Sequence, residues 1–214
     1  MKKIQFLLNI LYPEVCFWCN NITKENPCKK CQIELNNITK FNVQYKKEGF
    51  EHVYLLLYKE KARSKILDYK FNEKNYMYSG FANLLLKNKK VYRFLENYDI
   101  IIPIPIHKAR CKKRGYNQSE LIAKKVAESF EHLKFEKNIL IKQENNKPQS
   151  TLNRKMREEN VKDVYKIKNI EKIINKKIIL FDDIYTTGST AKECIRILKK
   201  EGAKKVDILT IAKD

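Results

Sequence analysis

The stretch that most constrains the fold is the uninterrupted apolar run in KIILFDD, residues 177–183. A strand that is apolar at successive positions is typical of a parallel sheet covered by helices on both faces. A helical pattern follows from Thr190 to Lys200, and KKVDILTIAK, residues 204–213, has the composition of a further strand. Because strands alternate with helices, we predict an α/β fold whose open, mostly parallel sheet is flanked by helices.

The segments before this run extend the pattern. We predict strands at 52–58, from Asp99 to the prolines at 103 and 105, and at 138–143, and helices at 61–71, 77–88 and from about Asn117. Residues 144–165 are polar and highly charged, and we expect a long loop there, or a loop with a short helix. The one domain boundary that we expect lies between Cys31 and Gly49, which divides the chain into a small N-terminal module, residues 1–45, and a main domain, residues 46–214.

The cysteines are unevenly distributed. Four of the six lie together in CFWC and CKKC, at Cys16, Cys19, Cys28 and Cys31. Two Cys-x-x-Cys pairs can complete a tetrahedron around one Zn²⁺, and four sulfur ligands leave no open position for catalysis, so we predict structural zinc. A disulfide pair is disfavoured in a reducing cytosol, and a redox Cys-x-x-Cys needs only one pair. We expect Cys194 to be buried in a helix, whereas Cys111 lies among basic residues that could lower its pKa.

The charge of the chain favours phosphate-rich partners. Lys and Arg total 45 against 25 Asp and Glu, which gives a net charge of +20. Such an excess suits nucleic acids, nucleotides or an anionic membrane surface. The chain is also rich in Asn and Ile, as an AT-rich coding sequence would make it, so generic surface lysine is an open alternative.

The N-terminal stretch MKKIQFLLNILYP has two lysines before an apolar run. It lacks the small-residue cleavage site of a signal peptide and is shorter than the roughly 20 residues of a membrane span. We therefore expect a short amphipathic helix and, since no other segment is apolar enough to cross a bilayer, a cytoplasmic protein that could contact the inner membrane peripherally.

The loop after the apolar run has the composition of a phosphate site. TTGST, residues 186–190, opens a helix at the carboxyl end of a strand, where open α/β sheets bind ligands. Its backbone N–H groups and hydroxyls can surround a phosphate, and Gly188 allows close approach. Asp182 and Asp183 would accept hydrogen bonds from a vicinal diol or hold hydrated Mg²⁺, which together suggests a ribose 5-phosphate. The alternative is an N-capping loop with surface acids.

Three segments of the chain resemble one known family. IILFDDIYTTGST resembles the signature with which type I phosphoribosyltransferases bind 5-phosphoribosyl 1-diphosphate (PRPP). IPIPIHKARCKKRGYNQSELIA is similar to the proline-bounded basic segment of ComF-type competence proteins, and PQSTLNRKMREENV resembles their second segment. Their four-cysteine zinc module corresponds to Cys16 through Cys31. Lys108 and Lys112 stand where arginine is common in that family, which weakens bidentate phosphate binding without removing charge.

The resemblance implies roles for individual residues. Asp182 and Asp183 would be the catalytic residues and would engage the ribose hydroxyls, with Mg²⁺ accompanying PRPP. The 5-phosphate would be held by Thr186, Thr187, Gly188, Ser189 and Thr190. Contacts to pyrophosphate or DNA phosphate are implied for His107, Lys108, Arg110, Arg114, Arg154 and Arg157. The two last arginines could instead form a helix face that binds nothing, and Asn117 and Gln118 could simply cap a helix.

Two functional classes follow from the resemblance. The first is a PRPP-binding protein of natural transformation that supports uptake or handling of single-stranded DNA, with the DNA-translocation machinery at the inner membrane as a further partner. The second is an active phosphoribosyltransferase of nucleotide or base metabolism with no role in DNA uptake. The sequence contains no readable acceptor pocket, so whether the chain turns over PRPP stays open at this point.

Overall fold

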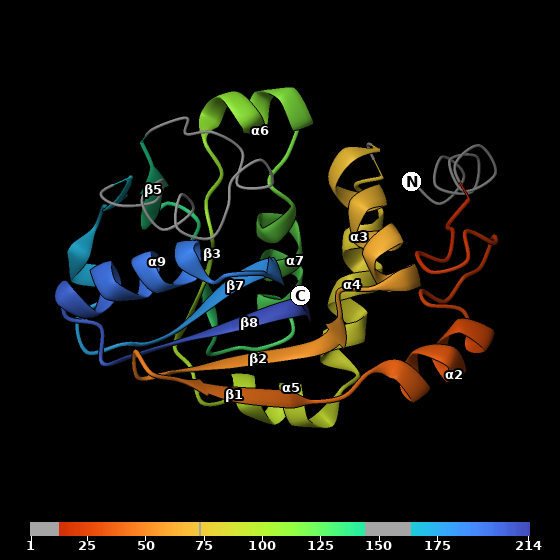
Figure 1. Cartoon of the computed structure of the whole chain (residues 1–214), viewed down its shortest axis with the longest axis horizontal. Helices are drawn as coiled ribbons and strands as arrows, with labels where there is room; N and C mark the ends of the chain where they lie inside the picture. The colour runs from red at the N-terminus through yellow and green to blue at the C-terminus, as the bar shows by residue number, and fades with distance from the viewer. Residues whose placement is uncertain (1–12, 73, 144–163) are drawn as a thin grey trace.

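A six-stranded sheet forms the centre of the protein (Figure 1). The computed structural model describes residues 13–72, 74–143 and 164–214. The strand order is β1-β2-β8-β7-β3-β4, and every pair is parallel except β1 with β2. The strands are β1 (Asn42–Lys46), β2 (Phe50–Leu57), β3 (Ile100–Pro103), β4 (Lys134–Phe135), β7 (Lys177–Tyr185) and β8 (Lys205–Lys213). The predicted α/β class with an open, mostly parallel sheet is confirmed.

Helices cover both faces of this sheet. One face carries α3, α4, α5 and α7, and the other carries α9. The helices are α2 (Lys29–Ile38), α3 (Glu60–Phe71), α4 (Met77–Leu86), α5 (Lys89–Leu95), α6 (Lys108–Arg114), α7 (Gln118–Ala127) and α9 (Ser189–Lys200), with a 3₁₀ turn at Ile170–Lys172. Within the described ranges, no helix combines the length and apolar content that a membrane crossing requires. The helix expected at the N-terminus lies outside the described residues.

The position of β7 between two hydrophobic cores explains its uninterrupted apolar run. Ile179 and Phe181 pack into the core beneath α3, α4 and α7, while Ile178 and Leu180 pack into the core beneath α9. Successive side chains of a strand point to opposite faces, so a strand with a core on each side needs apolar residues at every position.

The cysteine-rich segment shares a core with the main sheet. Cys16, Phe17 and Trp18 are fully buried in the same cluster as the helices on that face. The Phe17 ring lies 4.8 Å from the ring of Phe81 in α4. The division at residue 45 stays a prediction, and β1, which begins at Asn42, pairs with β2 of the main sheet.

The structure differs from the predicted elements in several places, and it contains α2, α5, β1 and β4, where no element was predicted. The segment after β3, expected as a loop, contains the short helix α6, and the strand expected at 138–143 is β5 (Leu140–Lys142), which lies outside the main sheet. It pairs antiparallel with β6 (Tyr165–Ile167), a strand that the polar composition of the preceding segment obscured. Strand β7 extends two residues beyond the predicted 177–183, to Tyr185, because β8 pairs with it along that whole length.

Candidate functional site

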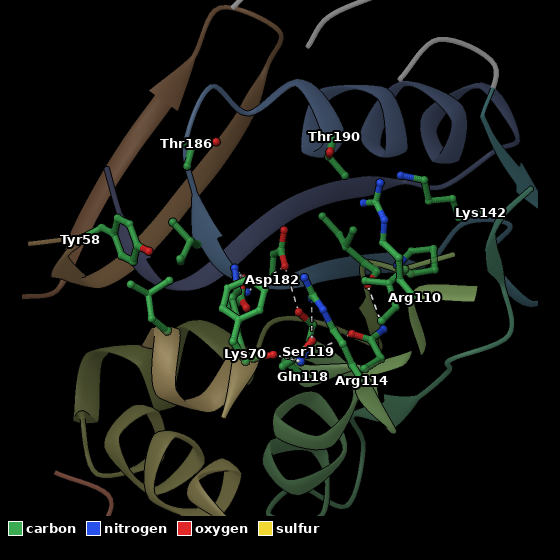
Figure 2. Close-up of a pocket in the computed structure, with 18 of the residues that line it drawn as sticks. Tyr58, Lys70, Arg110, Arg114, Gln118, Ser119, Lys142, Asp182, Thr186 and Thr190 are labelled. Atoms are coloured by element: carbon green, nitrogen blue, oxygen red, sulfur yellow. Dashed lines mark hydrogen bonds and ion pairs between the residues drawn. The ribbon is translucent and has the colours of Figure 1, made fainter. Parts of the chain in front are cut away.

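A pocket of about 470 Å³ opens at the carboxyl ends of β3 and β7 (Figure 2). Its volume is in the range of small-molecule sites. Its walls come from α3, α6, α7, the β5–β6 pair and the start of α9, and its polar lining consists of Tyr58, Arg63, Lys70, Arg110, Arg114, Asn117, Gln118, Ser119, Lys142, Tyr165, Asp182, Asp183, Thr186, Thr190 and Asp214.

The two acids of β7 lie in different surroundings. Asp183 is buried, and its Oδ1 lies 2.9 Å from Lys70 Nζ of α3. The Oδ1 atom of Asp182 accepts hydrogen bonds from Ser119 Oγ and from the backbone N–H of Asp183, each at 2.9 Å. Burial and the neighbouring Asp183 carboxylate raise the pKa of Asp182 to about 7. The site therefore holds one ion-paired carboxylate beside one that is poised to bind or release a proton near neutral pH.

The loop from Thr186 to Thr190 turns from β7 into α9. Gly188 precedes the helix with φ +76°, a left-handed conformation that side-chain-bearing residues rarely adopt. Thr187 Oγ1 lies 2.8 Å from Ser189 Oγ, which fixes two hydroxyls at the helix N-terminus. A small hollow of about 30 Å³ is lined by this loop together with Asp182 and Tyr185. Hydroxyls and N–H groups at a helix N-terminus are a favourable environment for a phosphate.

Two cations meet at the end of the pocket formed by α6 and β5. Arg110 and Lys142 both line it and lie near each other in Figure 2. Burial, and then the charge of Arg110, lower the pKa of Lys142, which is only 8% exposed. Burial and the charge of Arg114 lower the pKa of Arg110 in the same way. These partly buried cations repel one another, so a bound polyanionic ligand would stabilise their charged forms.

The Arg-Gly-Tyr-Asn-Gln segment, residues 114–118, connects the pocket floor to α3. Asn117 caps α7 by accepting from the N–H of Ser119, and its amide donates to the carbonyl of Ile104. Gln118 is buried, donates to the carbonyl of Lys70 at 3.3 Å, and accepts from Arg114 at 3.4 Å. The capping role considered from sequence is therefore observed for Asn117, while Gln118 ties α7 to the residue that pairs with Asp183.

The four clustered cysteines meet the geometric requirement of a zinc site. Their Sγ atoms all lie within 4.8 Å of one another, and Cys19 Sγ is 3.8 Å from Cys28 Sγ. A tetrahedron with Zn–S bonds of about 2.3 Å has S–S edges of about 3.8 Å. Burial raises the pKa of Cys16, but N–H donors from Cys28, Cys19 and Trp18 outweigh burial and bring it to about 7. The donor set fits a tetrahedral thiolate metal such as Zn²⁺.

The chain is similar to a known domain and to several curated proteins. The profile of the phosphoribosyl transferase domain matches residues 116–214. Competence protein F of Haemophilus influenzae is 25% identical over 214 residues, covering 96% of this chain and 93% of that protein. Competence protein ComFC of Streptococcus pneumoniae is 27% identical over 202 residues, covering 94% and 81%. Over nearly its whole length the chain is ComFC-like, and its residues 116–214 match a phosphoribosyl transferase domain. The DNA utilization protein YhgH of Escherichia coli O6:H1 is 26% identical over 142 residues, covering 65% of this chain and 61% of that protein.

In this ComFC-like protein, most of the predicted site residues lie at one pocket. Asp182, Asp183, Thr186, Thr190, Arg110 and Arg114 line the main pocket, and Gly188 and Ser189 line the adjoining hollow. Thr187 contacts Ser189 within the same loop. Arg154 and Arg157 lie outside the described residues.

Two predicted contacts lie elsewhere in the ComFC-like fold. His107 is the N-cap of α6, and its Nδ1 accepts from the backbone N–H of Ala109 at 3.1 Å. Lys108 is exposed on the same short helix. Among the described residues that line the pocket, neither appears. Their roles at a phosphate stay predictions.

Several pocket residues carried no sequence signal. Lys70, Ser119 and Lys142 each come from a segment whose pattern indicated only a helix or a strand. Lys142 could have been noticed as a charge in an otherwise apolar strand, but its partner Arg110 is 32 positions away. A charge within an apolar strand is therefore a signal for Lys142 alone, and the sequence offers none for Lys70 or Ser119.

Proposed function

We propose that this protein binds PRPP and acts in natural transformation, where it supports uptake or handling of single-stranded DNA in the cytoplasm. The relatives are named for competence and for DNA utilization, which favours this function over a purely metabolic phosphoribosyltransferase. The observation that carries the PRPP proposal is that three chemically distinct elements line connected hollows. These are a hydroxyl loop at a helix N-terminus, an acid pair, and a partly buried cation pair.

The loop end of the pocket suits the 5-phosphate and the ribose. In this proposal the residues from Thr186 to Thr190 bind the 5-phosphate through hydroxyls and N–H groups. Asp182 and Asp183 accept hydrogen bonds from the ribose hydroxyls. A bound diol would favour the ionised form of Asp182, since it donates to the carboxylate.

The opposite end suits the diphosphate. Arg110 and Lys142 supply positive charge in a partly buried setting, where electrostatic attraction is stronger than in water. Carboxylate oxygens are the ligands that Mg²⁺ prefers, so Asp182 and Asp183 could also accompany the Mg²⁺ that PRPP carries. In a reaction, the same cations would stabilise charge on departing pyrophosphate.

The zinc module and the charge of the chain complete the proposal. Zn²⁺ on the four cysteines would be structural, because all four coordination positions are sulfur. The net charge of +20 supplies sequence-independent attraction to DNA. Transfer of DNA from translocation machinery at the inner membrane is the corresponding partner hypothesis.

The test uses fragments of PRPP, because each end of the pocket makes a separate prediction. Calorimetric titrations of zinc-loaded protein would use PRPP with Mg²⁺, ribose 5-phosphate, and pyrophosphate with Mg²⁺. We expect Thr187→Ala to weaken ribose 5-phosphate binding and to leave pyrophosphate unaffected, and Lys142→Met to do the reverse. Both variants should weaken PRPP itself by about tenfold or more, as the loss of one charge-assisted hydrogen bond predicts.

The control is Lys125→Met, which removes an exposed lysine from α7. Its PRPP affinity should equal that of the wild type. No PRPP binding to folded, zinc-loaded wild type would overturn the PRPP proposal and leave the basic surface as the functional element. If PRPP binds, release of pyrophosphate in the presence of DNA or free bases tests for turnover.

A further inference from the structure

Two arginine–aromatic pairs flank the pocket mouth on the side of α3. Arg63 Cζ lies 5.9 Å from the ring centroid of Tyr58, and Arg114 Cζ lies 4.9 Å from that of Phe71. All four residues line the pocket. Neither pair belongs to the phosphate loop, the acid pair or the cation pair.

Helix α3 places three of its pocket-lining residues on one face. Arg63, Leu67 and Phe71 are spaced at i, i+4 and i+8, so they lie along one stripe of the helix, and all three line the pocket. Tyr58 lies two residues before the helix, at the end of the pocket opposite Lys142, with Asp182 between them (Figure 2). We call Tyr58, Arg63, Leu67, Phe71 and Arg114 the α3 rim.

The α3 rim has the composition of a single-strand binding surface. Phe71 is 60% exposed, although a large aromatic ring gains stability from burial. Single exposed aromatics are common, but here two aromatics with adjacent guanidinium groups face one opening. Proteins that bind single strands combine aromatic platforms for bases with cations that follow the phosphates.

The α3 rim is also linked to the acid pair. Arg114 donates to Gln118, Gln118 donates to the carbonyl of Lys70, and Lys70 pairs with Asp183. The interior of the pocket is lined by the acid pair and by the residues proposed to bind PRPP. A DNA strand would therefore follow the arginines at the mouth and leave the ribose subsite to a smaller ligand.

We propose that the α3 rim binds single-stranded DNA, with bases stacked on Tyr58 and Phe71 and phosphates beside Arg63 and Arg114. This inference rests on the proposed function only in taking DNA as the partner. It adds the surface that binds and the mode of binding, and it places the strand next to the PRPP pocket. Stacking without base-edge hydrogen bonds makes the binding tolerant of sequence.

The experiment measures fluorescence anisotropy of labelled oligo-dT on full-length, zinc-loaded protein over a series of salt concentrations. An abasic oligonucleotide of the same length has the phosphates but no bases. We expect Phe71→Ala to weaken oligo-dT binding about 5- to 20-fold, in line with the loss of one stacked base, and to leave abasic binding unchanged. Arg63→Ala should weaken both ligands and reduce the slope of log affinity against log salt by about 0.7, as loss of one phosphate contact on a single strand predicts.

Matched controls come from the opposite edge and base of the sheet. Tyr45→Ala removes an aromatic that is 80% exposed on β1, and Arg93→Ala removes an exposed cation on α5. Both should bind oligo-dT within twofold of wild type. An unchanged thermal midpoint and an unchanged zinc content in each variant would exclude misfolding. Retained PRPP binding in Phe71→Ala would show that the pocket is intact.

Four outcomes would overturn the inference. If the control variants weaken DNA binding as much as the α3-rim variants do, binding is spread over the basic surface. If wild type binds abasic and oligo-dT strands equally, there is no stacking. Wild type that binds no single-stranded DNA at all would contradict the DNA part of the proposed function as well, whereas intact DNA binding by Phe71→Ala and Arg63→Ala contradicts only the α3-rim site.

Discussion

Lys70 Nζ lies 2.9 Å from Asp183 Oδ1, which joins the last turn of α3 to the end of β7. The side chain of Asp183 is 6% exposed and that of Lys70 is 20% exposed. An ion pair this far from water balances desolvation against attraction, so removing one partner leaves an uncompensated charge. The pair fixes α3, the α3 rim and the acid pair relative to one another.

We predict that Lys70→Met lowers the free energy of unfolding by about 3 kcal/mol, because the Asp183 carboxylate loses its cation. Urea denaturation measures the change. Lys125→Met is the matched control, since its pair with Glu128 has side chains that are 42% and 49% exposed, and such surface pairs contribute at most about 1 kcal/mol. Adding Asp183→Asn to Lys70→Met should recover part of the loss. Equal effects of the two lysine substitutions would show that the Lys70 pair is not a buried interaction.

The raised pKa of Asp182 predicts a pH dependence of stability. An unfolded aspartate titrates near about 3.9, whereas burial and Asp183 bring the folded Asp182 to about 7. Between these values the folded state binds more protons, so the Asp182 contribution to stability falls as pH rises through this window. Asp182→Asn keeps the oxygen that accepts from Ser119 and Asp183, and it removes this loss. We therefore expect the variant to gain stability relative to wild type from pH 4.5 to pH 8.

Urea unfolding of both proteins at several pH values tests this prediction. Wild type and variant should be nearly equal near pH 4.5, where Asp182 is protonated in the folded state. The same variant should bind PRPP more weakly, if the ionised carboxylate binds the ribose. A difference in stability that does not change with pH would show that the Asp182 carboxyl group is not perturbed by folding.

Gly188→Ala should disrupt the phosphate loop. The new Cβ would overlap the ring and hydroxyl of Tyr185, and the backbone has φ +76°. We expect a loss of about 2 kcal/mol or more in stability, and loss of ribose 5-phosphate binding. Gly49→Ala is the control, since φ is +73° there but the nearest atom to a new Cβ is Lys199 Nζ at 3.7 Å. Unchanged ligand binding in Gly188→Ala would contradict the role of this loop.

Loss of the metal should destabilise the main core. Cys28→Ser is expected to release zinc and lower the thermal midpoint of the whole chain, because Phe17 and Trp18 of the cysteine-rich segment pack in the core that α3 and α4 share. A colorimetric zinc assay and thermal melts with and without a chelator measure both effects. Cys111→Ser, outside the cluster, should retain zinc. A wild type whose melting is unaffected by chelator would contradict the zinc assignment.

Local pattern predicted the parts of the site that are contiguous in the chain. The run of apolar residues, acids and hydroxyls from Ile178 to Thr190 forms one strand, turn and helix. The cysteine pairs come together as their spacing indicated. The buried state of Cys194 is confirmed as well. The predictions on element type failed at α6, a short basic helix that was expected as a loop, and at β6, which lies at the end of a polar segment and pairs with β5.

Local patterns were enough to predict the fold class, the hydroxyl loop that opens α9 and the candidate metal ligands, because periodicity and short motifs are properties of neighbouring residues. Which cations face the acids depends on how distant segments pack. Lys70 reaches Asp183 across 113 positions, and Arg110 and Lys142 lie at the same end of the pocket, because helices and strands distant in the chain pack against the same end of the sheet. The α3 rim arises in the same way, since the α3 residues Arg63 and Phe71 meet their aromatic and cationic partners only after the chain has folded.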